Sequence, residues 1–224
     1  MTKRFQNKRV LLTDAAGFMG PAVSELMREE GAHVLADRRD LTKPNGVESL
    51  VREAGHVDVL IANLAAPYTM AYAHEATESD FNDMFERLVL PLHRLVRTVL
   101  PQMIERRKGK IVVVGSALAL RGTPMRANYA AARGAQLAYV KTVALEAIRH
   151  NVHVNAAALA FVENPTYYSA EYQNTEDFKQ RMRDVPVGRL ATGREAASLV
   201  LYLASPESDF IVGQVIPYSG GFVT

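Results

Sequence analysis

Two side chains near the middle of the chain have the types and the spacing of a catalytic pair. In "NYAAARGA", Tyr129 lies four residues before Arg133, and on a helix this spacing puts both side chains on one face. Arginine stays protonated in proteins, so its charge can stabilise a deprotonated phenol without exchanging the proton itself. Ser116 stands 13 residues before Tyr129, at the end of an apolar run. The three residues indicate a tyrosine that acts as a base, with a plain stacking pair on the surface as the alternative.

The elements that must position these residues follow from the apolar pattern. The run "GKIVVVGSA" predicts a strand that is buried on both faces, and Tyr129 lies at the start of a predicted helix that ends near His150. The other predicted strands are 9–13, 33–37, 57–63, 152–158 and 213–221, the other predicted helices are 20–31, 45–55, 78–107 and 193–205, and 159–185 is a loop-rich excursion. This alternation predicts an α/β fold with a Rossmann-like, doubly wound parallel sheet flanked by helices, in a single domain of residues 1–224.

The composition excludes several classes of protein. The chain has 224 residues, 48% of them hydrophobic, and a formal net charge of +2 that comes from scattered basic residues, which indicates a solvated face rather than a nucleic-acid site. It has no cysteine, and its six histidines lack metal-binding spacing, so we expect neither disulfides nor a metal. No apolar stretch approaches 20 residues, which predicts neither a signal peptide nor a membrane span and points to a cytoplasmic protein.

Four motifs then occur in order along the chain: "DVLIANLA", "VLPQMIERRKGKIVVVGSALA", "VHVNAAALAFVENP" and "LYLASPESDFIVGQVIPYSGG". Together with the spacing between Ser116 and Tyr129, they resemble the short-chain dehydrogenase/reductase family from end to end. The resemblance implies the fold described above. Because that family hosts more than one chemistry, the reaction must be argued from the site.

The first departure from the family pattern is the phosphate-binding loop, which reads "TDAAGFMG" here. Asp14 and Phe18 replace two of the glycines that normally bring backbone N–H groups to a pyrophosphate, and only Gly20 remains. A carboxylate about 4 Å from a phosphate charge costs about 4 kcal/mol at an effective dielectric constant of about 20. The alternative is that Asp14 only caps the helix and Phe18 only packs, with Gly17 permitting a shifted loop.

Three more departures affect the rest of the cofactor cleft. Only 25 residues separate Asp37 from Asn63, so the βα unit on the adenine side is expected to be shortened, and Asp37 is expected to form a surface ion pair with a neighbouring arginine. The Pro-Gly after the sixth strand of the family becomes Leu159-Ala160, and its threonine becomes Asn164. The lysine of the active site is Arg133, and the helix asparagine falls on Leu88. We therefore expect no nucleotide cofactor.

A serine–tyrosine–arginine set on a cofactor-free scaffold resembles the halohydrin dehalogenases, a branch of the same superfamily. The resemblance implies the roles of the three catalytic residues. Ser116 would hydrogen-bond the substrate hydroxyl, Tyr129 as phenolate would take its proton, and Arg133 would set the acidity of Tyr129. The alkoxide would then expel the neighbouring halide and form an epoxide, and the reverse reaction would open epoxides with azide, cyanide or nitrite.

The same resemblance implies a halide site made of backbone N–H groups. The predicted halide-binding residues are Phe18, Pro67, Leu159, Ala160, Phe161 and Val162, and the predicted residues of the substrate pocket are Tyr168 and Leu118. For Pro67 and Tyr168 an ordinary hydrophobic lid is the alternative. The implied partners are a haloalcohol or epoxide and a small anion, and the family resemblance implies a homotetramer built through the long helices.

Two other functions stay open on the sequence alone. An NAD(P)H-dependent short-chain carbonyl reductase with a tolerant glycine loop would bind nucleotide in the micromolar range. A dehydrogenase-fold scaffold without activity would lose nothing measurable on Tyr129→Phe. The preferred haloalcohol and its enantiomer depend on residues 118–127 and 161–178, whose conformation the sequence does not give.

Overall fold

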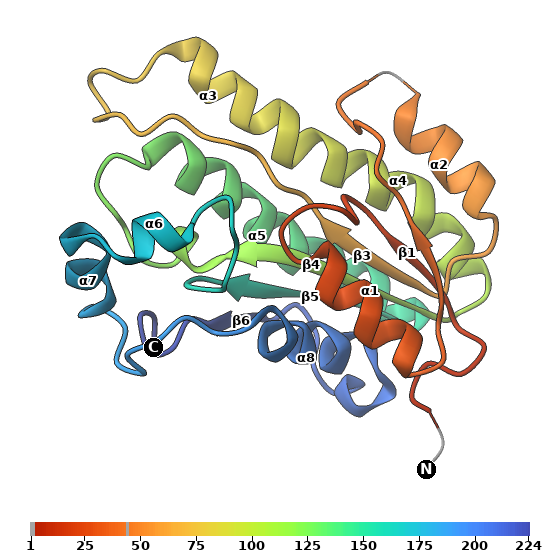
Figure 1. The fold of residues 1–224 in the computed structure, drawn as a ribbon. Helices are drawn as coiled ribbons and strands as arrows, with labels where there is room; N and C mark the ends of the chain where they lie inside the picture. Colours follow the sequence, from red (N-terminus) through yellow and green to blue (C-terminus); the bar gives the residue numbers. More distant parts are fainter. Residues whose placement is uncertain (1–2, 44) are drawn as a thin grey trace.

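The computed structural model describes residues 3–43 and 45–224, and these fold around one parallel sheet. The strands are β1 (Arg9–Leu12), β2 (His33–Ala36), β3 (Val59–Asn63), β4 (Gly109–Ser116), β5 (Val152–Leu159) and β6 (Val215–Tyr218). The helices are α1 (Gly20–Glu29), α2 (Gly46–Ala54), α3 (Glu78–Met84), α4 (Leu90–Glu105), α5 (Ala127–Ala147), α6 (Ala170–Gln173), α7 (Glu176–Met182) and α8 (Gly193–Ala204). The strand order is β2-β1-β3-β4-β5-β6, as in Figure 1, which confirms the predicted doubly wound fold.

Helices cover both faces of the sheet and form two cores. One core packs α2, α4 and α5 against the sheet, and the other packs α1 and α8 against its opposite face (Figure 1). Strand β5 is buried along its whole length, and β4 is buried except at Lys110, as their largely apolar sequences predict. Their register pairs Ser116 with Leu159. The carboxyl end of β4 therefore lies beside the loop that follows β5, and the two segments with predicted functions come together.

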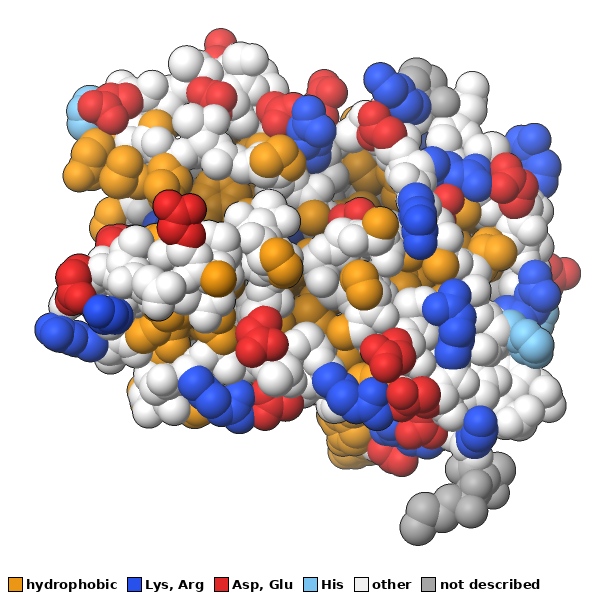
Figure 2. Space-filling view, viewed as in Figure 1, with side chains coloured by type: hydrophobic (Ala, Val, Ile, Leu, Met, Phe, Trp, Pro, Cys, Tyr) orange, Lys and Arg blue, Asp and Glu red, His pale blue; other side chains and the backbone are white. Residues whose placement is uncertain are grey.

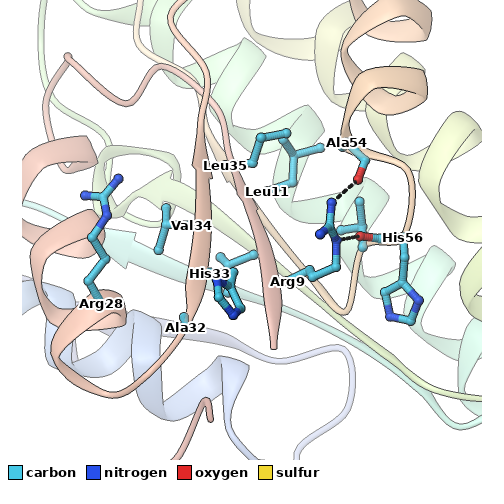
Figure 3. A pocket seen from close by; sticks show the side chains of 11 residues that line it. Arg9, Leu11, Arg28, Ala32, His33, Val34, Leu35, Ala54 and His56 are labelled. Carbon is cyan, nitrogen blue, oxygen red and sulfur yellow. Dashed lines mark hydrogen bonds between the residues drawn. The ribbon is translucent and has the colours of Figure 1, made fainter. Parts of the chain in front are cut away.

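The shortened unit on the adenine side leaves β2 at the edge of the sheet. This strand pairs only with β1, and three of its four residues are exposed. A pocket of about 310 Å³ opens along this edge, between the ends of α1 and α2 (Figure 3). Arg9 crosses it and donates hydrogen bonds to the carbonyls of Ala54 and His56. The predicted loss of a βα unit is confirmed.

The long helical stretch predicted over 78–107 is interrupted. Between α3 and α4 the segment Phe85–Val89 forms a π-helical turn. Pro91 has no backbone N–H and cannot continue the regular ladder of α4, and a π turn accommodates this loss with one wider loop of backbone. The turn matters for the site, because it leaves the carbonyl of Leu88 available to a side chain from α5.

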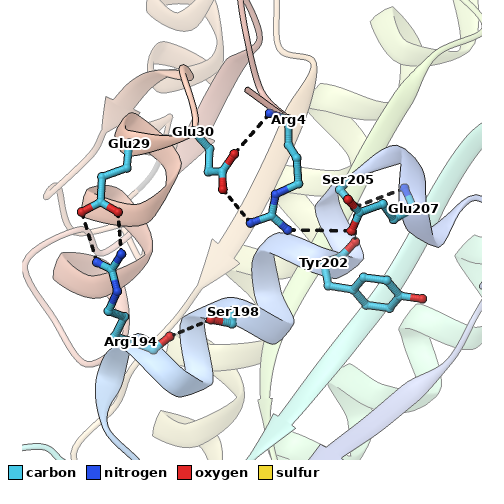
Figure 4. Close-up of polar contacts among 8 residues, drawn as sticks. All are labelled: Arg4, Glu29, Glu30, Arg194, Ser198, Tyr202, Ser205 and Glu207. Atoms are coloured by element: carbon cyan, nitrogen blue, oxygen red, sulfur yellow. Dashed lines mark hydrogen bonds and ion pairs between the residues drawn. The ribbon is translucent and has the colours of Figure 1, made fainter. Parts of the chain in front are cut away.

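Surface ion pairs link α1 to α8, and the N-terminal segment to Glu30, the residue that follows α1. Arg194 pairs with Glu29 at 2.6 Å, and Arg4 pairs with Glu30 at 3.0 Å (Figure 4). These side chains are substantially exposed, so each pair contributes little compared with the apolar core beneath it. Basic and acidic side chains are interspersed on this face (Figure 2), as expected for a solvated surface. Within the described residues no helix is long and apolar enough to span a bilayer.

Candidate active site

Tyr129 and Arg133 lie on one face of α5, as their spacing predicts. The Nε of Arg133 donates a hydrogen bond to the Tyr129 hydroxyl oxygen at 3.0 Å, and the guanidinium lies 5.1 Å from the centre of the ring. The alternative of a surface stacking pair is wrong, because Arg133 is only 3% exposed. The pair belongs to the interior of the molecule.

Backbone and amide oxygens hold the remaining nitrogens of Arg133. Nη1 donates to the carbonyl of Val114 at 3.1 Å and to Oε1 of Gln136 at 3.0 Å, and Nη2 donates to the carbonyl of Leu64 at 2.8 Å. No carboxylate of the described residues lies within 4 Å of this guanidinium. The buried guanidinium therefore has no acidic partner among the described residues, and its Nε–H faces the hydroxyl oxygen of Tyr129.

Gln136 is a site residue that the sequence analysis missed. It is fully buried on α5, accepts from Arg133, and donates from Nε2 to the carbonyl of Leu88 at 2.7 Å. That carbonyl belongs to the π-helical turn Phe85–Val89, so the turn fixes the orientation of the amide, and the amide fixes the guanidinium. Pro91 close behind Leu88 was the available sequence signal for an irregular turn, but nothing in the sequence paired Leu88 with Gln136.

Ser116 occupies the predicted place at the carboxyl end of β4. It is buried, and its Oγ accepts a hydrogen bond from the amide of Leu118 at 3.3 Å. Among the residues that the structure describes, the hydroxyl donates to no protein acceptor, so its proton is free for a substrate oxygen. Leu118 is half-buried in the short turn that follows. Its amide contact with Ser116 places it beside the serine, and its part in the substrate pocket stays a prediction.

An aromatic wall covers the ring of Tyr129. Tyr68 stacks on Tyr129 with ring centres 4.5 Å apart, Tyr167 stacks on Tyr68 at 6.4 Å, and Phe18 meets the edge of Tyr167 at 6.5 Å. Pro67, which was predicted to line the site, is exposed, and its neighbour Tyr68 makes the contact. Tyr68 and Tyr167 carry no sequence signal of their own, because loop segments of distant origin bring them together.

Tyr168, the other predicted pocket residue, lies beside the predicted halide loop. It stacks on Phe161 at 6.4 Å and meets the edge of Phe178 at 5.9 Å. Burial raises the pKa of Tyr168 to about 12. Tyr168 thus packs on the loop after β5, in an aromatic group separate from the one that covers Tyr129.

The loop after β5 offers two of the predicted backbone N–H groups. The amide of Ala160 donates to the carbonyl of Tyr218 at 3.1 Å, so this group is engaged and cannot hold an anion as predicted. Phe161 has a positive φ of 54°, and Val162 is buried. Within 3–43 and 45–224 the amides of Phe161 and Val162 donate to no protein acceptor. These two successive N–H groups follow Leu159 at the end of β5, and the halide site that they were predicted to form stays a prediction.

Asp14 occupies the phosphate loop at the start of α1. Its carboxylate folds over Gly17, where an added Cβ would lie 2.5 Å from Oδ2. Burial raises the pKa of Asp14, while hydrogen bonds from the backbone amides of Gly17 and Ala65 act to lower it. Asn63 donates from Nδ2 to the carbonyls of Asp14 and Gly17, and its buried Oδ1 has no partner in the described part of the chain. The loop is therefore held closed by its own side chains.

These residues do not fit a nicotinamide dinucleotide. The amide of Gly17 already donates to the carbonyl of Asp14 at 3.0 Å, and the Asp14 carboxylate over Gly17 would face the negative charge of a pyrophosphate. The ring of Phe18 packs against Tyr167 in the same region. On the adenine side Asp37 pairs with Arg39 at 2.6 Å, so the predicted ion pair is confirmed, but Asp37 is buried rather than at the surface.

Elsewhere the described residues contain no group of three or more histidine, aspartate or glutamate side chains that could hold a metal ion. The fold and the site together define a Rossmann-like α/β protein. Its tyrosine lies on the helix after β4 and its serine at the end of that strand.

Comparisons with known proteins give the family. A sequence family described as enoyl-(acyl carrier protein) reductase matches residues 4–223. The 3-oxoacyl-(acyl-carrier-protein) reductases FabG of Thermotoga maritima and Vibrio cholerae are 31% and 30% identical, and the matches cover 98% and 96% of this chain and 99% and 97% of the relatives. The chain belongs to the short-chain dehydrogenase/reductase superfamily.

Solved structures agree on the fold. A structure named "Dehalogenation enzyme" has a TM-score of 0.89 and 31% identity, and the match covers 97% of this chain and 99% of that one. A gluconate 5-dehydrogenase from Burkholderia cenocepacia in complex with NADP and tartrate has the same TM-score at 22% identity, with 99% and 97% coverage. The second likeness shows the fold alone.

Proposed function

We propose that the protein is a halohydrin dehalogenase, which converts vicinal haloalcohols to epoxides without a nucleotide cofactor. The observation that carries the proposal is the buried Arg133, which no carboxylate of the described residues neutralises and which donates to the Tyr129 hydroxyl. A charge in this position stabilises the phenolate, the form of tyrosine that can remove a proton. The name of the structural neighbour called "Dehalogenation enzyme" agrees with this chemistry.

In the proposed reaction Ser116 donates its free hydroxyl proton to the substrate oxygen. The phenolate of Tyr129 takes the proton from the substrate hydroxyl, and the oxygen then attacks the neighbouring carbon from the side opposite the halogen. A carbon–oxygen bond forms, the carbon–halogen bond breaks, and the halide leaves with the electron pair. The free amides of Phe161 and Val162 are suited to receive it. Tyr129 returns its proton to solvent.

The reverse direction follows from the same arrangement. A small anion such as azide, cyanide or nitrite that enters the amide concavity would open an epoxide, while the Tyr129 hydroxyl gives its proton to the developing alkoxide. The Arg133 hydrogen bond serves both directions, because it stabilises the phenolate that remains. A homotetramer is part of the proposal and rests on the family resemblance.

The test is to incubate the purified protein with 1,3-dichloro-2-propanol, without nucleotide, and to follow chloride release. Tyr129→Phe removes the proposed base, and we expect at least about a 100-fold loss of chloride release. Tyr139→Phe is a matched control, because Tyr139 lies on the same helix and contacts only the exposed ring of His93 through its hydroxyl. No chloride from a panel of haloalcohols, or equal rates for the two variants, would contradict the proposal.

The second candidate function is an NAD(P)H-dependent carbonyl reductase, which the FabG relatives favour. This function requires micromolar binding of NADPH or NADH. Titration of the protein with NADPH, followed by the fluorescence of the nicotinamide, separates the two candidates. Tight binding together with reduction of a carbonyl substrate would establish the reductase and overturn the dehalogenase.

A further inference from the structure

A second buried arginine lies next to the catalytic tyrosine. Arg126 directly precedes α5 and is 8% exposed. Its Nε donates to the hydroxyl oxygen of Tyr68 at 3.1 Å, and its Nη1 donates to the carbonyl of Pro124 at 3.4 Å. Tyr68 in turn stacks on Tyr129, so one aromatic ring separates Arg126 from the proposed base.

The charge of Arg126 has no partner. No carboxylate of residues 3–43 and 45–224 lies within 4 Å of its guanidinium. Burying a charge without a counter-charge is costly, and a structure normally pairs it. Arg133 is also unpaired, but each of its three nitrogens donates to a protein oxygen. Arg126 differs, because its Nη2 donates to no acceptor in the described residues.

This unused nitrogen can still be reached. Among the described residues, the one buried side-chain nitrogen or oxygen that is both sealed from solvent and unpartnered is Oδ1 of Asn63. The Nη2 atom of Arg126 is not sealed in this way, so it keeps some contact with accessible space. An available N–H at the edge of a buried guanidinium is a place for an anionic oxygen from outside the chain.

Arg126 lies close to the proposed catalytic residues and to the proposed halide loop. Arg126 is the residue directly before α5, and Tyr129 and Arg133 follow on the first two turns of that helix. Arg126 also lies near enough to Tyr168 for its positive charge to act on this phenol, whose pKa burial raises to about 12. Tyr168 stacks on Phe161 of the proposed halide loop. The guanidinium therefore lies near both the ring that covers the proposed base and the tyrosine that packs on that loop.

We propose that Arg126 binds a carboxylate of the substrate, so that the preferred substrates are halohydrin acids rather than neutral haloalcohols. This inference rests on the proposed function and names the substrate class of the same site. A guanidinium forms short, charge-assisted hydrogen bonds with a carboxylate, which would use Nη2 and neutralise the buried charge. The reacting atoms are unchanged: the alkoxide oxygen bonds to the halogen-bearing carbon, the halide leaves with the electron pair, and the carboxylate keeps its charge.

The first measurement compares kcat/KM for chloride release from 4-chloro-3-hydroxybutanoate and from its methyl ester. We expect the wild type to prefer the acid by at least about tenfold, the range of a hydrogen bond to a charged group. Arg126→Gln should lower kcat/KM for the acid about 10- to 100-fold and leave the ester within about threefold. Arg126→Lys keeps the charge and should recover part of the preference. Equal rates for acid and ester in the wild type would overturn the inference.

Two further variants separate binding from a structural role. If Arg126 only holds Tyr68, Arg126→Gln and Tyr68→Phe lower the rates of acid and ester alike, and this result contradicts the proposal. Arg52→Gln is the matched control, because Arg52 is an exposed arginine on α2, a helix that contributes no residue to the proposed site. This variant should leave kcat/KM for both the acid and the ester unchanged.

Binding of 3-hydroxybutanoate, which has no leaving group, keeps the inference separate from the proposed function. Isothermal titration calorimetry of the wild type and of Arg126→Gln measures the carboxylate site directly. Binding that requires Arg126 without any chloride release supports the carboxylate site and contradicts the dehalogenase. Absence of binding to the wild type overturns the carboxylate site even where neutral haloalcohols react.

Discussion

The two ends of the carboxyl edge of the sheet hold their polar side chains in different ways. At the reactive end, which consists of β4, α5 and the loop after β5, Arg133 reaches oxygens of residues 64, 114, 129 and 136. At the truncated end, which consists of β1, β2 and the phosphate loop, Arg39 reaches Asp37, Ser49 and Glu53, all within 14 residues. The guanidinium of Arg133 thus reaches segments 19 and 69 residues away, whereas the contacts of Arg39 are all local.

This difference teaches where a substitution should affect function. Contacts that join distant segments hold the reacting groups only when the whole fold is in place, so a change there alters stability and activity together. Local contacts at the exposed edge strand stabilise that edge and nothing else. We therefore expect substitutions at the reactive end to be tolerated least, although both ends belong to one nucleotide-binding architecture.

Arg133→Lys is expected to have the largest effect. A lysine keeps the charge but cannot reach all the oxygens that the guanidinium holds, which leaves buried carbonyls at Val114 and Leu64 unpaired. We expect a loss of about 3 kcal/mol in the free energy of unfolding and about a 100-fold loss of chloride release. Urea denaturation and the chloride assay measure the two effects.

The exposed Lys141→Arg on the same helix is the control for Arg133→Lys and should match the wild type in both assays. A stable and fully active Arg133→Lys would remove the contrast between the two ends, because charge alone would then suffice at the reactive end.

Arg39→Ala tests the truncated end and should have an intermediate effect. The substitution leaves the buried carboxylate of Asp37 without its partner at 2.6 Å. Because Arg39 is about one third exposed and Glu53 is mostly exposed, we expect a loss of only about 1 kcal/mol in the free energy of unfolding. Chloride release should stay within about twofold. A large loss of activity with stability unchanged would show that this end takes part in the reaction.

Asp14→Asn should have the smallest effect and a distinct pH dependence. Burial raises the pKa of Asp14 in the folded protein, so folding favours the protonated carboxyl. Its contribution to stability is present at low pH and is lost as the pH rises through the ordinary range of an aspartate to the raised value. Thermal melts from pH 3.5 to pH 8 should therefore show that the melting temperature of the variant, relative to that of the wild type, increases as the pH rises. The opposite trend would mean that the two backbone amides dominate.

Much of the fold could be predicted from the sequence. The alternation of apolar strands and helices fixed the doubly wound sheet, and the short spacing between Asp37 and Asn63 predicted the missing strand. These features depend on local patterns and on chain length, which one sequence contains in full. The excursion over 159–185 was predicted as loop-rich, and it also contains the short helices α6 and α7, whose Ser169 and Thr175 caps are too brief a signal to separate from turns.

The features of the candidate site also fall into those that the sequence predicts and those that only the structure shows. The sequence by itself determined the pairing of Tyr129 with Arg133 and the position of Ser116, because helical spacing and a strand end place them. Only the tertiary structure decided that Gln136 joins the network, that Tyr68 rather than Pro67 covers the phenol, and that the amide of Ala160 is already used. These contacts join residues 48, 61 and 58 positions apart (Leu88 to Gln136, Tyr68 to Tyr129, Ala160 to Tyr218). Such pairings are set by how the packed elements meet, which no local pattern encodes.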